Sequence, residues 1–426
     1  MNLTRTISVT GLGYVGLTIA SAFGEINEVI GYDKSDIRID ELKQGYDRNG
    51  EVSSEQLHHA DIRYTTDPSA LKRANFHIIS VPTPTNEAKQ PDFSYLRAAS
   101  EAVGKALKRG DIVVYESSVY PGATEEICIP VLEQASKLKC GKDFGVGYSP
   151  ERINPADKEH VLSTVPKIIS AVNKESLDVI ADVYTKIVKA GVYRVSSIRV
   201  AEATKIIENI QRDVNVSFVN EIAMMLHNLG IDSREVLDAA RTKWNFLPFK
   251  PGLVGGHCVG VNSCYLTYKA EESGFHPDLL LTSRRINEHM TTYIADHAIK
   301  QLIHLGVPVK GARIAVLGLT YKENYPDVYD TKVIDVVNAL REYETEIFIH
   351  DPLADPKAVK KVFDMEPSDL SELHDMDAII IAVSHEHYRT MKPKELEKIL
   401  KKKRLIMDVK GILSPNDFTK TTVWQL

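Results

Sequence analysis

The chain has 426 residues and a formal net charge of −6, with 43% hydrophobic and 26% charged residues. At roughly 150 residues per domain, this length predicts two or three domains that each bury their own core. The composition is typical of a globular protein, and the acidic balance argues against nucleic acid as the main partner. No apolar run approaches the roughly 18 residues of a membrane span, so no membrane partner is expected.

The four cysteines, Cys128, Cys140, Cys258 and Cys264, form neither a CxxC pair nor a metal-ligand spacing. We therefore expect no disulfide scaffold and no metal site. The first predicted strand follows Met1 so soon that a signal peptide is not expected. These features predict a cytoplasmic protein, because the reducing cytosol keeps a thiol free to react.

The first predicted strand, residues 7–9, leads into the run Gly11-Leu12-Gly13-Tyr14-Val15-Gly16 and a helix from Tyr14 to about residue 24. Asp33 closes the second strand, residues 29–33. In such a unit the glycines let the backbone approach a pyrophosphate at the helix N-terminus, and the acid binds ribose hydroxyls. The pattern favours a dinucleotide site over a merely structural turn. Asp33 would repel a 2′-phosphate, which favours NAD over NADP, although Lys34 and Arg38 could accommodate that phosphate.

Four further strands are predicted in this part of the chain, at residues 77–81, 112–115, 145–148 and 167–172. The loop Val81-Pro82-Thr83-Pro84 ends the first of them, and Glu116-Ser117-Ser118 ends the second. Loops at the carboxyl ends of parallel strands line the cofactor crevice in doubly wound folds. Either loop is equally compatible with a rigid structural turn.

Residues 200–229 follow a helical pattern for about 45 Å, long enough to serve as a spine between two lobes. Further helices are predicted at about 233–241 and 278–304. On the long helix, Glu202, Lys205, Asn209 and Arg212 are spaced by three, four and three residues and form one polar stripe. The stripe could face water, or it could face a cleft and hold an alkoxide or a water molecule.

The segment from Pro251 to Gly260 brackets Cys258 with four glycines. Such a loop can bring backbone close to a ligand and expose a thiol, which favours a nucleophile over the usual buried core cysteine. Cys264, in the helical pattern that follows, is interpreted as core.

The opening pattern recurs near the C-terminus, where a strand at 314–317 leads into Gly318-Leu319-Thr320-Tyr321-Lys322. A helix-like stretch and a strand ending at Asp351 follow, and further strands are predicted at 378–383 and 405–409. A degenerate phosphate turn with Lys322 suits a second nucleotide, and the alternative is a structural relic. The predicted fold class is α/β, with two Rossmann-like doubly wound parallel-sheet domains joined by a long central helix and an all-α middle domain.

Together these residues resemble the UDP-glucose/GDP-mannose dehydrogenase family over essentially the whole chain. The runs that carry the resemblance are ESSVYPG (116–122), YSPERINP (148–155) and residues 201–209, 249–260 and 316–322. Within the family, the sequence is most similar to bacterial UDP-N-acetylglucosamine/galactosamine 6-dehydrogenases of surface-polysaccharide biosynthesis.

The resemblance implies an NAD-binding Rossmann domain at 1–198, a central helical domain that dimerises at 199–308, and a UDP-sugar-binding domain at 309–426. It implies a cytoplasmic homodimer and NAD as the cofactor. The expected cofactor-binding residues are Gly11, Gly13, Tyr14, Val15, Gly16, Asp33, Arg38, Val81, Pro82, Thr83, Ser117 and Ser118.

The resemblance also implies a four-electron oxidation of the C6 hydroxyl of a UDP-sugar. Cys258 captures the aldehyde as a thiohemiacetal, and a second hydride transfer gives a thioester that water hydrolyses to the acid. Lys205 and Asn209 stabilise the oxyanion, and Glu151 assists the acid–base steps. Ser118 and Asn262 complete the expected catalytic set. The expected substrate-binding residues are Glu151, Arg152, Lys205, Asn209, Arg212, Arg241, Phe249, Gly252, Gly255, Tyr321 and Lys322, of which Arg241 would reach the neighbouring subunit's substrate.

Among the positions that depart from the family pattern, which include Ala156, Ser263 and Cys264, two bear most on activity. Asn262 stands where relatives usually carry an aspartate, and Tyr329 stands where they often carry an arginine that touches substrate. An asparagine cannot act as a base. The alternative to an N-acetylhexosamine substrate is UDP-glucose. The alternative functions are a catalytically impaired UDP-sugar-binding homologue, which these two departures favour, and a two-electron hydroxyacid dehydrogenase. The last shares a Rossmann domain and a lysine–asparagine pair.

Overall fold

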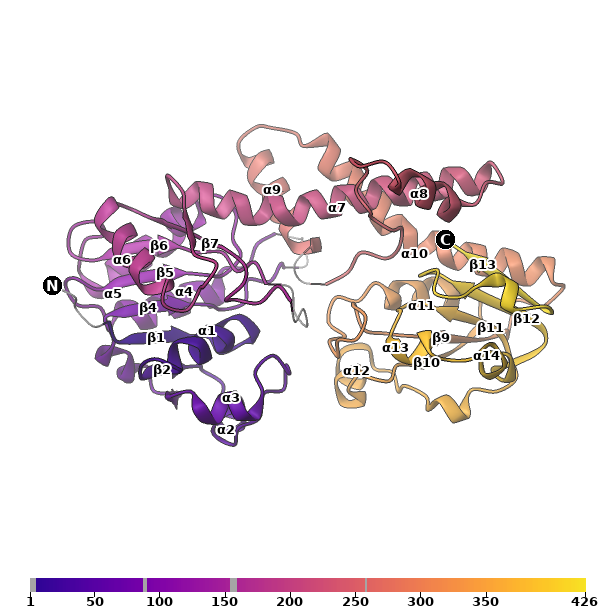
Figure 1. The fold of residues 1–426 in the computed structure, drawn as a ribbon, viewed down its shortest axis with the longest axis horizontal. Coiled ribbons are helices and arrows are strands. Elements are labelled where there is room, and N and C mark those ends of the chain that lie inside the picture. Colours follow the sequence, from indigo (N-terminus) through magenta and orange to yellow (C-terminus); the bar gives the residue numbers. More distant parts are fainter. Residues whose placement is uncertain (1–4, 87–89, 154–158, 257–258) are drawn as a thin grey trace. The chain divides into compact units, whose positions relative to one another are not determined.

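The computed structural model describes residues 5–86, 90–153, 159–256 and 259–426. These residues form two compact units, drawn in Figure 1. The first comprises residues up to Asn209 together with Cys264–His276, and the second comprises Ile210–Ser263 and Pro277–Leu426. The long central helix α7 (Ile198–Asn228) contributes residues to both units.

Within the described residues, the first unit contains an eight-stranded sheet in the order β3-β2-β1-β4-β5-β6-β7-β8. Its strands are β1 (Ile7–Thr10), β2 (Val29–Tyr32), β3 (Ile62–Thr65), β4 (Phe76–Ile79), β5 (Ile112–Tyr115), β6 (Gly145–Tyr148), β7 (Lys167–Ala171) and β8 (Val192–Arg194). The sequence predicts only parallel strands, and this is wrong at one place, because β7 runs antiparallel to β6. β3 and β8 were also not expected; both are short and only partly buried, so they lack the apolar run that marks the inner strands.

Helices connect these strands in the manner of a doubly wound fold, with α1 packed on β1 and β2 and α6 packed on β6 and β7. The helices of this unit are α1 (Tyr14–Gly24), α2 (Asp36–Lys43), α3 (Ser54–His59), α4 (Ser94–Gly104), α5 (Ile129–Ser136) and α6 (Lys174–Tyr184), with a 3₁₀ turn at Pro68–Arg73 and a π turn at Thr124–Cys128. Helix α9 (Val259–Glu272) contributes its later residues to this unit.

The second unit contains a parallel sheet in the order β10-β9-β11-β12-β13 among the residues described. Its strands are β9 (Arg313–Leu317), β10 (Glu346–His350), β11 (Met376–Ile381), β12 (Leu400–Asp408) and β13 (Thr421–Gln425). Its helices are α8 (Ser233–Arg241), α10 (Asp278–His304), α11 (Val333–Arg341), α12 (Pro356–Phe363), α13 (Glu386–Arg389) and α14 (Pro393–Ile399), with 3₁₀ turns at Leu370–Glu372 and Pro415–Asp417.

Strand β9 shows why this sheet is covered on both faces. Ile314 and Val316 belong to one buried cluster with residues of α10 and α11, whereas Ala315 and Leu317 belong to another with residues of α14. Alternate side chains of a strand point to opposite faces, so an unbroken apolar strand requires a helix layer on each side. The doubly wound fold class predicted from the sequence is confirmed for both sheets.

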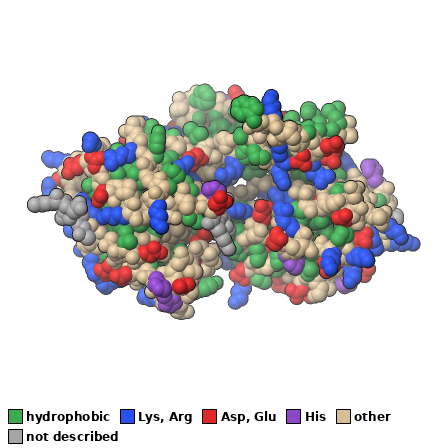
Figure 2. Space-filling model, viewed as in Figure 1, with side chains coloured by type: hydrophobic (Ala, Val, Ile, Leu, Met, Phe, Trp, Pro, Cys, Tyr) green, Lys and Arg blue, Asp and Glu red, His purple; other side chains and the backbone are tan. Residues whose placement is uncertain are grey.

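The predicted repeat of strand, turn and helix is only partly correct in the second unit. In the first unit α1 begins at Tyr14, immediately after the glycine turn. In the second unit a loop follows Gly318, and α11 begins only at Val333. No helix of the described chain is long and apolar enough to cross a membrane. Acidic and basic side chains are interspersed over the face shown in Figure 2.

Candidate active site

The glycine turn after β1 requires glycine at two of its three positions. Gly11 has φ +89°, and a Cβ built on it would lie 2.3 Å from the carbonyl oxygen of Ser80. A Cβ on Gly16 would lie 1.9 Å from the carbonyl oxygen of Gly11. A Cβ on Gly13 would meet nothing within 4 Å. The turn is therefore packed on its inner side and open at Gly13, next to Tyr14 and Val15 at the start of α1, as a pyrophosphate site requires.

Asp33 retains acceptor capacity for a ribose. Its Oδ2 accepts a hydrogen bond from the backbone N–H of Leu12 at 2.9 Å, and its Oδ1 accepts one from Ser35 at 3.0 Å. Each carboxylate oxygen has two lone pairs, so one on each remains for a ligand hydroxyl. Asp33 thus both fixes the turn and presents an acceptor beside it.

Arg38 supports the turn from within the protein. Its Nε donates to the carbonyl oxygen of Leu12 at 2.8 Å, and its guanidinium forms an ion pair with Asp47 at 2.8 Å. The side chain is buried, and Lys34 lies over the ring of Tyr95 at 4.3 Å. Because both cations beside Asp33 have partners within the protein, the geometry favours NAD over its 2′-phosphorylated form.

The loops after β4 and β5 are joined by hydroxyl groups. The Oγ of Ser117 donates to the carbonyl oxygen of Val81 at 2.7 Å and accepts from the Val81 N–H at 3.0 Å. Thr83 donates to the carbonyl oxygen of Ser118 at 2.7 Å, and Tyr265 of α9 donates to the carbonyl oxygen of Thr83. The exposed Pro82 lies between these contacts. The two loops predicted to line the crevice therefore form one connected edge.

The polar stripe of α7 is mostly buried. Glu202, Lys205 and Asn209 are at most 9% exposed, and only Arg212 is exposed to solvent. For the first three residues the water-facing alternative is wrong. The Glu202 carboxylate accepts hydrogen bonds from the N–H groups of Gly122 at 2.5 Å and Thr124 at 2.9 Å, which hold the loop after β5 against α7.

The loop that carries Glu151 lies against the same helix. Oε1 of Glu151 accepts hydrogen bonds from the N–H groups of Arg152 and Ile153, each at 2.6 Å. The Arg152 guanidinium pairs with Glu208 of α7 at 2.7 Å, one turn along the helix from Lys205. This ion pair places the Glu151 loop beside the part of α7 that carries Lys205 and Asn209.

Two buried polar atoms of this region have no hydrogen-bond partner among the described residues, Oε2 of Glu151 and Nδ2 of Asn209. Buried polar groups of native proteins are almost always paired, so each such atom calls for an explanation. A substrate oxygen or a water would accept a hydrogen bond from Nδ2 of Asn209. A hydroxyl group or a water with a transferable proton would donate one to Oε2 of Glu151.

The glycine segment before Cys258 is fixed by contacts within the second unit. Gly252 and the side chain of Asn220 exchange hydrogen bonds of 2.8 and 3.1 Å. Gly256 donates to the carbonyl oxygen of Asp330 at 3.0 Å, and a Cβ on it would lie 2.7 Å from the ring of Tyr321. A Cβ on Gly255 would lie 2.6 Å from the same carbonyl oxygen. The glycines are required because the segment packs directly on the turn that follows β9.

Cys258 itself lies outside the described residues. Helix α9 begins at Val259, and on it Asn262 is 1% exposed with neither side-chain polar atom paired within the described chain. Burial raises the pKa of Cys128 to about 12 and that of Cys140 to about 11, so both remain protonated at neutral pH. Cys264, interpreted from the sequence as core, is only partly buried.

Asp351, which lies beside the turn after β9 as Asp33 lies beside the first turn, has no free acceptor. Oδ2 of Asp351 accepts hydrogen bonds from the N–H groups of Leu319 and Thr320 and lies 3.1 Å from Nε2 of His385. Oδ1 of Asp351 accepts two more, from Leu353 and Ala354. These five contacts leave the carboxylate no lone pair for a ligand. Despite its burial, these hydrogen bonds hold the pKa of Asp351 well below its usual range.

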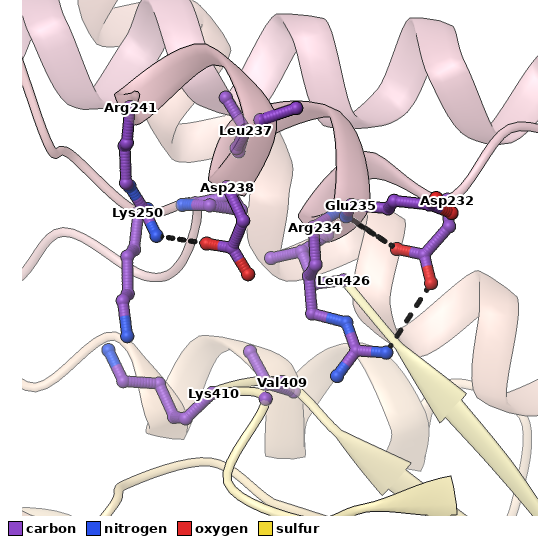
Figure 3. A pocket seen from close by; sticks show the side chains of 13 residues that line it. Asp232, Arg234, Glu235, Leu237, Asp238, Arg241, Lys250, Val409, Lys410 and Leu426 are labelled. Carbon is purple, nitrogen blue, oxygen red and sulfur yellow. Dashed lines mark hydrogen bonds and ion pairs between the residues drawn. The ribbon is translucent and has the colours of Figure 1, made fainter. Parts of the chain in front are cut away.

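Two cavities of the second unit meet at Lys410. One, of about 170 Å³, is lined by the turn Thr320–Glu323, which includes Tyr321 and Lys322, together with Leu253, Gly255 and Lys332. The other, of about 630 Å³, lies between α8 and the end of β12 and is lined by the cations Arg234, Arg241 and Lys250 and by the acids Asp232, Glu235 and Asp238. Figure 3 shows Lys250 and Lys410 extending toward each other across it. Burial lowers the pKa of Lys410 against the attraction of Glu323, and repulsion from Arg389 and Lys250 adds to this lowering. This excess of cations suits an anionic ligand.

Arg241 lies at the edge of the larger cavity, at the end of α8. Its guanidinium donates to the carbonyl oxygen of Phe249 at 3.0 Å and pairs with Asp238, while its buried Nε has no partner among the described residues. The exposed residue Tyr329 lies on the loop that begins at the turn after β9.

Sequence profiles match this chain in three consecutive parts. An NAD-binding domain profile matches residues 5–188, a central-domain profile matches residues 199–289, and a UDP-binding domain profile matches residues 315–415. All three describe one family, and they match in its order. The chain belongs to the UDP-glucose/GDP-mannose dehydrogenase family. As a member it is an NAD-dependent nucleotide-sugar dehydrogenase, with the glycine turn and Asp33 inside the NAD-binding match and Tyr321 and Lys322 inside the UDP-binding match.

Full-length relatives of this dehydrogenase include protein CapL of Staphylococcus aureus, which is 50% identical and is matched over 100% of both chains. The UDP-N-acetyl-D-glucosamine 6-dehydrogenase of Salmonella typhi is 46% identical over 96% of each chain. Among solved structures, a UDP-D-ManNAc dehydrogenase from Pyrococcus horikoshii superposes with a TM-score of 0.90 at 29% identity, covering 99% of this chain and 98% of that one.

Proposed function

We propose that the dehydrogenase oxidises C6 of UDP-N-acetyl-D-glucosamine from alcohol to carboxylate, in the service of surface-polysaccharide synthesis. The observation that carries the proposal is the 46% and 45% identity, over 96% of this chain, to two relatives with that named activity, from Salmonella typhi and Pseudomonas aeruginosa. UDP-N-acetylgalactosamine and UDP-glucose are the alternative substrates, because a few contacts with the sugar suffice to choose among them.

The reaction needs two hydride acceptors for each sugar. The turn Gly11–Gly16 and Asp33 would hold NAD, which would supply the hydride-accepting chemistry of each oxidation. The thiol of Cys258 adds to the aldehyde, so that its sulfur bonds to C6 and the carbonyl oxygen takes up a proton. Loss of the second hydride and of that proton gives a thioester, which water cleaves to the carboxylic acid and the free thiol. Covalent capture keeps the aldehyde on the enzyme between the two oxidations.

We propose that Lys205 and Asn209 stabilise the oxygen of C6 as it becomes an alkoxide. The support is their burial on α7 and the unpaired amide of Asn209. A donor without a protein partner is ready to bind developing charge without first breaking a hydrogen bond. Glu151 has one oxygen fixed by backbone N–H groups and the other without a hydrogen-bond partner among the described residues, and it is proposed as the acid–base residue that activates the hydrolytic water. Ser118 and Asn262 are proposed to order the same region.

The diphosphate of the substrate is proposed to bind the second unit through Lys322, Lys410 and the turn around Tyr321. The lowered pKa of Lys410 supports this, since a dianionic ligand would relieve the repulsion among the cations there. Arg152, Arg212, Phe249, Gly252 and Gly255 are proposed as further substrate contacts, and the domain limits at 198 and 308 remain a prediction.

We further propose a homodimer formed through the central helix, in the cytoplasm. Val200, Ile207, Phe218 and Met225 on α7, and Leu229 immediately after it, are all more than 40% exposed. A series of large apolar side chains on one helix is typical of a surface that another chain covers. In such a dimer, Arg241 would reach the partner's substrate. A reducing compartment would keep Cys258 as a thiol.

The proposal is tested by counting NADH formed per sugar with a panel of UDP-sugars. About two NADH per UDP-N-acetylglucosamine and no free aldehyde are expected, because two successive two-electron oxidations occur on one enzyme. One NADH with free aldehyde would instead indicate a two-electron hydroxyacid-type dehydrogenase. Binding without turnover would indicate an impaired homologue, the alternative that Asn262 and Tyr329 favour. Cys258→Ser is the matched variant and should form no acid.

A further inference from the structure

A buried charge cluster lies directly behind Glu151. Lys167 of β7 forms an ion pair with Glu116, at the end of β5, with Nζ and Oε2 2.6 Å apart. The same ammonium lies 3.8 Å from Oε2 of Glu151, the carboxylate oxygen with no hydrogen-bond partner among the described residues. The three side chains are at most 6% exposed, so solvent screens their interactions little.

Lys167 is bonded more closely to other groups than to Glu151. The ammonium also lies 3.4 Å from the carbonyl oxygen of Pro150, and Tyr184 donates a hydrogen bond to the other oxygen of Glu116. The Lys167 ammonium lies 5.4 Å from the centre of the Tyr184 ring. Lys167 is therefore hydrogen-bonded to Glu116, and it attracts Glu151 across a gap too long for a hydrogen bond.

We infer that Lys167 is a positioning residue for Glu151, and that Glu116 sets how much of the Lys167 charge Glu151 receives. The inference deepens the proposed function and rests on it, because it concerns the acid–base residue of that reaction. A full ion pair with Lys167 would occupy Oε2 of Glu151 and make it a poor base. No cation at all would leave two carboxylates in one buried site, which favours protonation. In the structure the Lys167 ammonium is hydrogen-bonded to Glu116 and lies near Oε2 of Glu151 without a hydrogen bond to it.

The neighbouring charges agree with this arrangement. Burial opposes the charge of Lys167, but Glu116 and Glu151 outweigh it and raise the pKa of Lys167. Burial raises the pKa of Glu116, against the attraction of Lys167. The other titratable groups that face the cluster are Arg152, which repels Lys167, and the buried phenols of Tyr148 and Tyr184.

The inference predicts opposite effects for two substitutions. Lys167→Met removes the cation, so Glu151 takes up a proton more readily and the acid limb of the rate–pH profile moves to higher pH. Glu116→Gln leaves Lys167 with Glu151 as its only carboxylate, so the acid limb moves to lower pH. Each displacement should be about one pH unit, the effect of losing or gaining one close buried charge. Lys167→Arg restores the charge and should return the profile toward that of the wild type.

The experiment measures NADH formation by the full-length enzyme with saturating NAD and UDP-N-acetylglucosamine as pH is varied. Lys108→Met is the matched control, because Lys108 of the same unit donates to the carbonyl oxygens of Lys72 and Ala74 and contacts none of the cluster. It should keep the wild-type profile.

The possible results distinguish a failure of the proposed function from a failure of the inference about Lys167. If wild type and Lys108→Met form no NADH from any UDP-sugar, the proposed function fails. If they are active but Glu116→Gln and Lys167→Met only lower the rate without moving the acid limb, Lys167 is merely structural and the inference is overturned. Glu116→Gln preserves shape, and its amide can still bond Tyr184, so an unchanged profile in this variant alone overturns the inference even if Lys167→Met does not fold.

Discussion

The side chain of Asn220 on α7 binds the backbone of Gly252 through two hydrogen bonds, one from the Gly252 N–H at 2.8 Å and one to its carbonyl oxygen at 3.1 Å. Asn220 is fully buried and also donates to Asn287 of α10 at 2.8 Å. A single amide thus joins two helices to the first residue of the glycine segment that leads to Cys258.

Asn220→Ala should therefore loosen the glycine segment. It leaves the N–H and carbonyl of Gly252 unpaired in a buried place, which costs about 1–3 kcal/mol of stability. Activity should fall further than the fraction of folded protein does, because this segment leads to the proposed nucleophile, Cys258. Thermal unfolding and NADH formation measure the two effects. Asn215→Ala is the control, since Asn215 lies on the same helix, is only partly buried and donates to the carbonyl oxygen of Gln211.

Gly13→Ala and Gly16→Ala should separate cofactor binding from folding. A methyl group at Gly13 meets no protein atom and its φ of −69° suits alanine, so stability should be unchanged while the methyl occupies the space above the turn. The affinity for NAD should fall at least tenfold, which titration calorimetry can follow. Gly16→Ala collides with the carbonyl oxygen of Gly11 and should lower the melting temperature as well. Equal NAD affinity in Gly13→Ala and wild type would contradict a pyrophosphate site at this turn.

Glu202 should make stability depend on pH. Burial raises the pKa of Glu202 to about 7, above its ordinary 4.5. Its contribution to stability is complete below the unfolded value and is lost as pH rises through the folded one, about 3 kcal/mol in all. Glu202→Gln does not titrate, so its stability relative to wild type should improve between pH 5 and 8. Denaturant unfolding at both pH values measures this difference, and a constant difference would show that Glu202 does not titrate there.

Lys410→Met should weaken the binding of UDP by tenfold or more, the effect of losing about 1.5–3 kcal/mol from a charged hydrogen bond. The pKa of Lys410 is lowered in the free protein. A bound anion would raise this pKa, so Lys410 should take up protons when the anion binds. UDP affinity should therefore decrease as pH rises, and calorimetry in buffers of different ionisation enthalpy reports the protons. Lys402→Met, at an exposed position of β12, should bind UDP as wild type does.

The sequence predicts this fold well where an apolar run is unbroken. Strands β5 and β6 and helices α8 and α10 begin and end at the predicted residues. The edge strand β8 was missed because its residues are mostly exposed, and the antiparallel direction of β7 was missed because burial on both faces gives the same apolar run in either direction.

Within the candidate site, residue types and spacing point to Lys205 and Asn209, and the family resemblance points to Glu151, but neither points to the groups that hold them. Glu116 and Lys167 lie 51 residues apart, one just after β5 and the other at the start of β7, and the sequence does not state that they meet. The role of Arg38 was likewise not accessible, since only the folded chain brings its guanidinium to the carbonyl of Leu12. Lys167 could have been noted as a lysine that begins a strand whose next residues are all apolar or small, a position where an unpaired charge is costly.

The five contacts that saturate Asp351 bear on how the enzyme keeps two nucleotides apart. A dinucleotide whose ribose needs a carboxylate acceptor finds one at Asp33, whereas Asp351, the acid that follows β10, has no lone pair left. The reduced cofactor, released twice in each catalytic cycle, thus has no equivalent place to lodge in the half of the protein that takes the sugar nucleotide. The filled lone pairs of Asp351 thus disfavour a dinucleotide ribose beside the second sheet.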